Sequence, residues 1–121
     1  MTKHNIVHVE FASKNPTASA AFYAGIFGWK MQEMPEMDYI TFDTEEGPGG
    51  GFPKIDGEMT NPGDVIVYIE TDDITATLKE IEAAGGKTLL AQTEIPEMGW
   101  FAFFEDPAGN RVALYKSMTE N

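Results

Sequence analysis

The feature that most constrains this chain is an internal repeat of one order of elements. Shifting the first half of the sequence by 58 positions places His8 on Ile66 and Gly28 on Gly86. Each half then reads as a strand, a helix and three further strands. A single unit of this kind has one helix for the two faces of its sheet, so one face would stay open to water. Two units can cover each other by forming one curved sheet with the helices outside.

The first half begins with a strand followed by a helix. Ile6–Ala12 alternates with period two, and Asn15 followed by Pro16 is a typical helix start. An apolar stripe runs along residues 17–27, and Gly28 ends it. Three strands are then predicted at Trp29–Met34, Tyr39–Asp43 and Gly49–Ile55. The glycine run 47–51 lacks the signals of a phosphate loop and favours close approach of the backbone, a bulge or a flap.

The second half follows a polar, turn-rich stretch, residues 56–63, which is the one credible linker. Val65–Thr71 is predicted as a strand, and Asp72 or Asp73 as the cap of a helix that extends through Ala84. Three strands follow, at Thr88–Ile95, Trp100–Glu105 and Asn110–Lys116. The last two enclose Asp106-Pro107-Ala108-Gly109, whose proline and glycine suit a tight turn.

These elements predict an α+β fold in a single domain of residues 1–121. Two βαβββ modules, at about 4–55 and 64–117, would form a cupped mixed sheet with the helices outside. Alternation along the first strand of each module agrees with this arrangement. One face is uniformly apolar, as expected against a helix, whereas the other carries His8, Glu10, Tyr68 and Glu70, as expected for the lining of a ligand cavity.

Composition narrows the range of partners. The net charge is −12 and Arg111 is the only arginine, whereas phosphate contacts need clustered Lys and Arg. We therefore expect no nucleic-acid partner and no membrane partner. The absence of cysteine excludes disulfides, zinc–thiolate sites and a thiol nucleophile. With no signal-peptide pattern and no long apolar run, a cytoplasmic location is expected.

Two segments carry a family resemblance: AFYAGIFGWK after the first strand and GWFAFFEDPAGNRVALYK near the end. Together with the repeat, they resemble the vicinal oxygen chelate superfamily, which includes glyoxalase I, fosfomycin- and bleomycin-resistance proteins and extradiol dioxygenases. The resemblance covers nearly the whole chain and is greatest for small uncharacterised proteins related to lactoylglutathione lyase. It implies the cupped fold, a small-molecule ligand and a homodimer.

The resemblance also implies a divalent metal in the cup, held from equivalent points of the two halves. Those points fall at His8, about Gly51, Ile66 and Ala113. Only His8 can donate to a metal, and a site of this kind needs three or four N or O ligands. We therefore predict no metal site and no cofactor. A relocated site that uses Glu10 or Glu70 stays an alternative, although a two-residue step moves a side chain by roughly 6–7 Å along a strand.

His8 and Glu10 are the candidate catalytic residues. A neutral imidazole can act as a base or hydrogen-bond a ligand, and a buried carboxylate can act as an acid. The alternatives are that Glu10 or a backbone carbonyl merely satisfies His8, and that Glu10 is solvated. The candidate ligand-binding residues are aromatic: Tyr39, Tyr68, Phe101, Phe103 and Tyr115. In the resistance proteins of this superfamily, the positions that match Phe101 and Phe103 face the ligand. These rings suit a flat or apolar molecule, or else they fill the cup as core.

Three functions follow as hypotheses. The first is metal-independent binding of a small apolar or aromatic molecule in the cup, with the reaction left open. The second is a metal-dependent, glyoxalase-like lyase or isomerase with rearranged ligands. The third is a non-enzymatic, drug-sequestering protein of the bleomycin-resistance type. Metal dependence separates the second hypothesis from the others, and turnover separates the first from the third. The identity of the ligand does not follow from the sequence.

Overall fold

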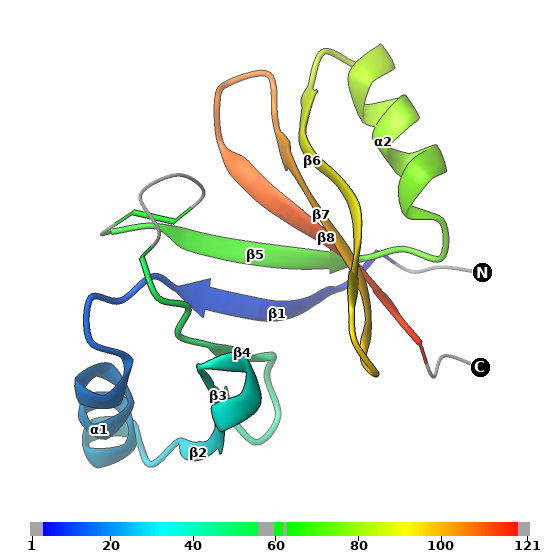
Figure 1. Cartoon of the computed structure of the whole chain (residues 1–121). Helices are drawn as coiled ribbons and strands as arrows, with labels where there is room; N and C mark the ends of the chain where they lie inside the picture. The colour runs from blue at the N-terminus through cyan, green and yellow to red at the C-terminus, as the bar shows by residue number, and fades with distance from the viewer. Residues whose placement is uncertain (1–3, 56–59, 62, 119–121) are drawn as a thin grey trace. The chain divides into compact units, whose positions relative to one another are not determined.

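The computed structural model describes residues 4–55, 60–61 and 63–118, and Figure 1 traces the chain through them. The chain divides into two compact units, Val7–Ile66 and a second unit that is mainly the chain from Val67 onward. Each unit follows the same order of elements. We call the elements up to β4 the first module and those from β5 onward the second module.

The first module contains one helix and four strands. Its elements are β1 (Ile6–Phe11), α1 (Pro16–Phe27), β2 (Lys30–Met34), a short 3-10 helix η1 (Pro35–Met37), β3 (Tyr39–Asp43) and β4 (Gly49–Gly51). The strands lie in the order β2-β3-β4-β1. β1 and β4 are parallel, whereas β2, β3 and β4 pair antiparallel along the sheet.

Helix α1 begins and ends where its sequence signals predict. The Asn15 side chain accepts a hydrogen bond from the Ala18 amide at 3.1 Å, and Gly28 ends the helix in the left-handed conformation, with φ of 75°. The helix packs on one face of the sheet through Ala20, next to Phe52, whose side chain is fully buried. The rings of Phe11 and Tyr23 stack beside them, with centroids 5.5 Å apart. This aromatic layer is the core of the first module.

The second module repeats this architecture. Its elements are β5 (Val65–Glu70), α2 (Ile74–Ala83), β6 (Lys87–Ile95), β7 (Gly99–Glu105) and β8 (Arg111–Ser117). The strands lie in the order β5-β8-β7-β6, with β5 parallel to β8 and the other pairs antiparallel. The Asp73 side chain caps α2 by accepting from the Ala76 amide at 3.0 Å.

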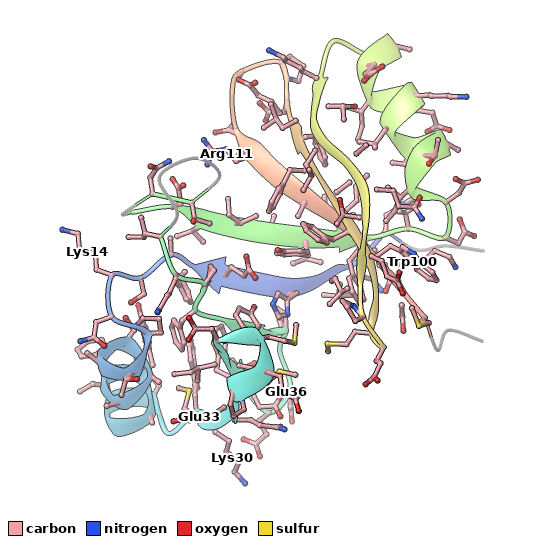
Figure 2. The ribbon with its side chains drawn as sticks, in the orientation of Figure 1. Lys14, Lys30, Glu33, Glu36, Trp100 and Arg111 are labelled. Carbon is pink, nitrogen blue, oxygen red and sulfur yellow. The ribbon has the colours of Figure 1, made fainter. Side chains whose placement is uncertain are left out.

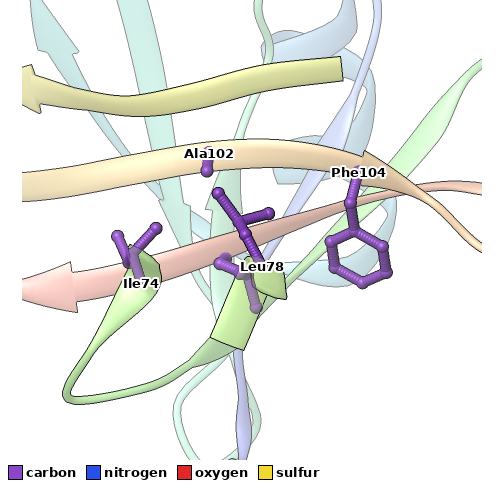
Figure 3. Close-up of a cluster of buried hydrophobic side chains, with 5 residues drawn as sticks. Ile74, Leu78, Ala102 and Phe104 are labelled. Carbon is purple, nitrogen blue, oxygen red and sulfur yellow. The ribbon is translucent and has the colours of Figure 1, made fainter. Parts of the chain in front are cut away.

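The core of the second module is mainly aliphatic, whereas that of the first is mainly aromatic. Ile74 and Leu78 on α2 pack against Ala102 and Phe104 on β7 (Figure 3). Leu114 on β8 completes the cluster and is 2% exposed. Because Ala102, Phe104 and Leu114 occupy even positions, the odd positions of β7 and β8 lie on the face away from the helix.

The turn between β7 and β8 has the predicted chemistry. The Asp106 carboxylate accepts hydrogen bonds from the amides of Ala108 and Asn110, each at 2.9 Å. The Asn110 side-chain amide donates a further bond at 2.9 Å, and these bonds hold the pKa of Asp106 below its ordinary value. Gly109 has φ of 93°, which an L side chain rarely adopts. The turn thereby fixes the register of the hairpin.

The structure confirms the predicted α+β fold class and its two βαβββ modules. The prediction for β4 was too long, because the strand ends at Gly51 rather than Ile55. Phe52 then turns into the core, and Pro53 has no N–H for a strand ladder. η1 was not predicted. Much of the predicted linker, including 56–59, lies outside the described residues. Among the described residues, no helix is long and apolar enough to cross a membrane.

The outer strand of the first module carries charges along its length. Lys30 and Glu33 on β2 are exposed, and Glu36 follows in η1 (Figure 2). Charged side chains on an edge strand discourage pairing with a foreign strand.

Candidate functional site

The candidate site lies on the face of the first module's sheet that points away from α1. Phe11, Ile40 and Phe42 pack toward the helix. Because side chains alternate along a strand, His8 and Glu10 on β1 and Tyr39 on β3 lie on the opposite face. Strand β4 lies between β1 and β3. The sheet therefore carries side chains 29 and 31 residues apart in the sequence into contact.

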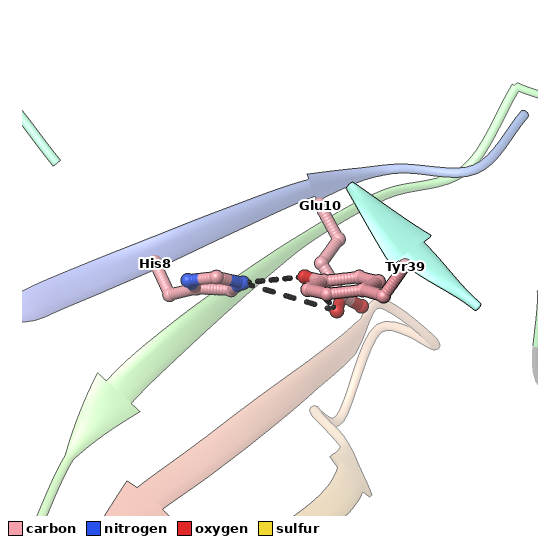
Figure 4. A network of polar contacts seen from close by, with 3 residues as sticks. All are labelled: His8, Glu10 and Tyr39. Carbon is pink, nitrogen blue, oxygen red and sulfur yellow. Dashed lines mark hydrogen bonds and ion pairs between the residues drawn. The ribbon is translucent and has the colours of Figure 1, made fainter. Parts of the chain in front are cut away.

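The Tyr39 hydroxyl joins His8 to Glu10. Its oxygen lies 2.7 Å from Nε2 of His8, and it donates to Oε2 of Glu10, also at 2.7 Å (Figure 4). The direct distance from His8 Nε2 to Glu10 Oε2 is 3.9 Å. Glu10 is 8% exposed, so its carboxylate is held in a largely dry environment. We call these three residues the polar triad.

Counting protons assigns the hydrogen bonds within the polar triad. The hydroxyl of Tyr39 has one proton, and an ionised Glu10 can only accept, so that proton goes to Glu10. The hydroxyl oxygen must then accept from His8, which requires the proton of a neutral imidazole to sit on Nε2. The neutral ring then carries its proton on Nε2 and its lone pair on Nδ1.

His8 is neutral over a wider pH range than an ordinary histidine. Burial lowers the pKa of its imidazole below 6.5, because a charged ring loses more hydration than a neutral one. Near neutral pH the ring is therefore a base rather than a cation. This is the protonation state required of a proton acceptor or of a hydrogen-bonding ligand contact.

Gly51 makes room for the ring of Tyr39. A Cβ atom built on Gly51 would overlap the Tyr39 hydroxyl and two carbons of its ring, far inside the 3.0 Å limit that real Cβ contacts respect. Gly51 also pairs with Glu10 across the β1–β4 ladder. The absence of a side chain at this position thus lets the hydroxyl reach both partners. The sequence signal for this contact is the glycine run, which predicts close approach without naming the group that approaches.

The other predicted ligand-binding residues lie in the second module. Phe101, Phe103 and Tyr115 occupy odd positions of β7 and β8, on the face away from α2. The Phe101 and Phe103 rings meet edge to face at a centroid distance of 5.5 Å, and Tyr68 meets Phe103 at 6.4 Å. Tyr68 and Phe103 are buried, whereas Phe101 and Tyr115 are partly exposed. The Tyr115 hydroxyl donates to the carbonyl of Met98 at 3.2 Å.

The donor set does not fit the metal that the superfamily resemblance implies. Of the four implied positions, Gly51, Ile66 and Ala113 have no side-chain donor atom. His8 and Glu10 supply two donors, and a protonated phenol lies between them. Within the described part of the chain, no three His, Cys, Asp or Glu side chains gather closely enough to hold an ion. A mononuclear site usually needs at least three protein ligands.

The fold is that of a two-module α+β protein, and comparison with known proteins names the family. The family model for the Glyoxalase/Bleomycin resistance protein/Dioxygenase superfamily matches residues 5–114, and the chain belongs to this superfamily. Among its relatives is the anthracycline biosynthesis protein DnrV of Streptomyces peucetius, 29% identical over 132 aligned positions, covering 88% of this chain and 45% of DnrV. A glyoxylase-like domain-containing protein of Didymella fabae is 30% identical, with 88% of each chain covered.

Solved structures agree on the fold. A superfamily member from Vibrio splendidus 12B01 has a TM-score of 0.66 at 15% identity, covering 93% of this chain and 98% of its own. At this identity the likeness shows the fold alone. The chain spans about half the length of DnrV, and the same holds for the Mycobacterium bovis protein named putative glyoxylase CFP32, of which 44% is covered. These matches show the family of the chain.

Proposed function

We propose that this protein binds a small apolar or aromatic molecule at the polar triad and that binding requires no metal ion. The observation that carries the proposal is the Tyr39 hydroxyl, which lies 2.7 Å from both His8 Nε2 and Glu10 Oε2. Glycine and the triad's own hydrogen bonds preset this geometry, so little ordering remains to be done when a ligand arrives.

The triad suits a ligand that carries an oxygen or an acidic C–H or O–H group. His8 is a neutral base near neutral pH, and protonation of its ring makes Nε2 a stronger donor toward Tyr39. The Glu10 carboxylate can then stabilise the positive charge on His8 through the Tyr39 hydroxyl, and both hydrogen bonds stay in place. The proposed chemistry is therefore proton exchange with the ligand, or hydrogen bonding alone where no reaction follows.

The second module, taken by itself, also presents aromatic side chains that suit a flat ligand. Phe101 and Tyr115, on the second module, are partly exposed rings of the kind that contact planar molecules. The name of DnrV ties that relative to anthracyclines, which are fused aromatic rings bearing oxygen substituents. An anthracycline is therefore a reasonable first probe, and its intrinsic fluorescence reports binding directly.

The test is a fluorescence titration of an anthracycline with chelator-treated protein. We expect saturable binding by the unmodified chain and binding weakened by about tenfold in Tyr39→Phe, the equivalent of roughly 1.4 kcal/mol. Tyr23→Phe is the matched control, because Tyr23 packs on the helix side of the same sheet and its loss of a hydroxyl leaves the triad intact. Equal binding by Tyr39→Phe and the unmodified protein would refute the role of the triad.

A second candidate function is a metal-dependent lyase or isomerase with rearranged ligands. It is favoured by one observation, the 3.9 Å between His8 Nε2 and Glu10 Oε2, which is closer than their spacing along the strand indicates. This function requires added Ni²⁺, Zn²⁺ or Mn²⁺ for binding or turnover in the same titration. A stoichiometric complex without turnover, at any metal concentration, would instead favour a sequestering protein.

A further inference from the structure

We infer that the Tyr39 side chain occupies the space that a side chain at position 51 would fill. Its phenol therefore lies where this site would otherwise accept a third ligand for an ion. This position of the Tyr39 ring accounts for a donor set of two side chains, His8 and Glu10, where a metal centre needs three. The inference is independent of the proposed ligand, because it predicts how the protein responds to metal ions alone.

The obstruction at Gly51 differs from that at its neighbours. A Cβ atom on Gly49 or Gly50 would meet backbone carbonyls, those of Phe42 and Val9 respectively, which the sheet holds in place. The three atoms nearest to a Cβ on Gly51 all belong to the side chain of Tyr39. Removing that one ring therefore removes the three closest obstructions to a side chain at position 51.

A side chain at position 51 would point to the space between His8 and Glu10. The Cβ direction of Gly51 runs into the Tyr39 hydroxyl, and that hydroxyl is in contact with both His8 Nε2 and Glu10 Oε2. The 3.9 Å between these two atoms lies within the span of two ligands of one ion at about 2.0–2.2 Å each. A carboxylate at position 51 would supply the third donor that the natural site lacks.

The phenol also explains how two potential ligands are kept from an ion. Its proton is donated to Glu10 and its oxygen accepts from His8, so both donors are engaged by one tethered group. An incoming ion would have to displace the hydroxyl and would still find only two ligands. Substituting Tyr39 and Gly51 would therefore give three potential ligands for an ion: His8, Glu10 and the new side chain at position 51.

The experiment is calorimetric titration of chelator-treated protein with Zn²⁺. We expect no stoichiometric binding by the unmodified chain and weak binding by Tyr39→Ala. Tyr39→Ala/Gly51→Glu should bind one equivalent at least about 100-fold more tightly than Tyr39→Ala does. Adding His8→Ala to the double variant should abolish the gain, and Tyr39→Ala/Gly51→Ala is the control that has the space without the ligand. Circular dichroism verifies that each variant folds.

Two results would overturn the inference. One is tight stoichiometric Zn²⁺ binding by the unmodified chain, and the other is a folded Tyr39→Ala/Gly51→Glu variant that binds no better. Should the double variant fail to fold, urea unfolding of the alanine variants decides the matter. We expect Gly51→Ala to lower the unfolding midpoint when Tyr39 is present and to leave it nearly unchanged in the Tyr39→Ala background. Equal losses in both backgrounds would show that Tyr39 does not occupy the position.

Discussion

The two modules share their strand order and differ on the face away from their helices. Strand registers define the equivalent positions, because Gly51 pairs with Glu10 on β1 and Ala113 pairs with Tyr68 on β5. The neighbouring ladders extend the match, since Thr41 pairs with Gly51 and Phe103 pairs with Ala113. The resulting equivalent pairs are His8 with Ile66, Glu10 with Tyr68, Tyr39 with Phe101, and Gly51 with Ala113.

The two modules are alike on the faces that pack against their helices and differ in the chemistry of the opposite faces. The helix-facing sides are apolar in both modules, as two small cores require. On the other face, the first module has an imidazole, a carboxylate and a phenol, where the second has mainly apolar and aromatic groups. The repeated skeleton therefore carries the polar triad in one copy and an aromatic surface in the other, and variants at equivalent positions can test the division.

The largest effects are expected from the two cores, where the modules should behave alike. Phe52→Ala should lower the free energy of unfolding by about 3–5 kcal/mol and Leu114→Ala by about 2–5 kcal/mol, because both side chains are almost fully buried. Urea denaturation measures both values. A near-neutral result for either variant would mean that its module contributes little to the folded state.

A smaller effect should separate the polar triad from an isolated tyrosine. Tyr39→Phe removes two hydrogen bonds and leaves the buried Glu10 short of one donor, which should cost about 1–3 kcal/mol. Tyr115→Phe removes a single, longer bond to the Met98 carbonyl and should cost less than about 1 kcal/mol. Urea unfolding of the two variants side by side tests this order, and the reverse order would contradict the geometry of the triad.

The smallest effect is the pH dependence that His8 adds to the first module. Burial lowers the pKa of His8, so below 6.5 the unfolded chain binds a proton that the folded chain does not. The free energy of unfolding therefore rises with pH between the lowered folded pKa and 6.5, and this contribution is complete above 6.5. The equivalent Ile66 has no titratable group.

Chemical denaturation across pH 4–8, a range chosen to bracket the ordinary histidine value of about 6.5, measures this slope. We expect the unmodified protein to lose more stability on acidification than His8→Gln does. Carboxylates outside the polar triad are common to both proteins, so they cancel in the difference. Parallel curves for the two proteins would show that His8 has an ordinary pKa.

Most of the fold could be predicted because its signals are local. Asn15 and Gly28 mark the ends of α1, and β3 has the bounds that alternation predicts. Asp106 and Gly109 define a turn within a few residues. The error at β4 arose because Phe52 breaks the strand to reach a core that sequence periodicity does not show.

The triad could be predicted only in part. His8 and Glu10 stand out because polar residues interrupt an apolar strand, but Tyr39 was expected to be a wall of the cavity and not the group that joins them. That contact depends on the strand order and on the missing side chain at Gly51. The spacing of His8 and Glu10 along β1 also overstates the distance between their tips, because both side chains bend toward one hydroxyl.

The most direct test of metal-independent binding at the triad is an NMR titration that follows the His8 ring. The chain has two histidines, so His4→Gln leaves a single imidazole signal. With chelator present, adding an anthracycline should shift the ¹⁵N resonances of His8 saturably, starting from a ring protonated on Nε2. Unchanged His8 resonances in chelator, with a response only after Zn²⁺ or Ni²⁺ is supplied, would contradict the account.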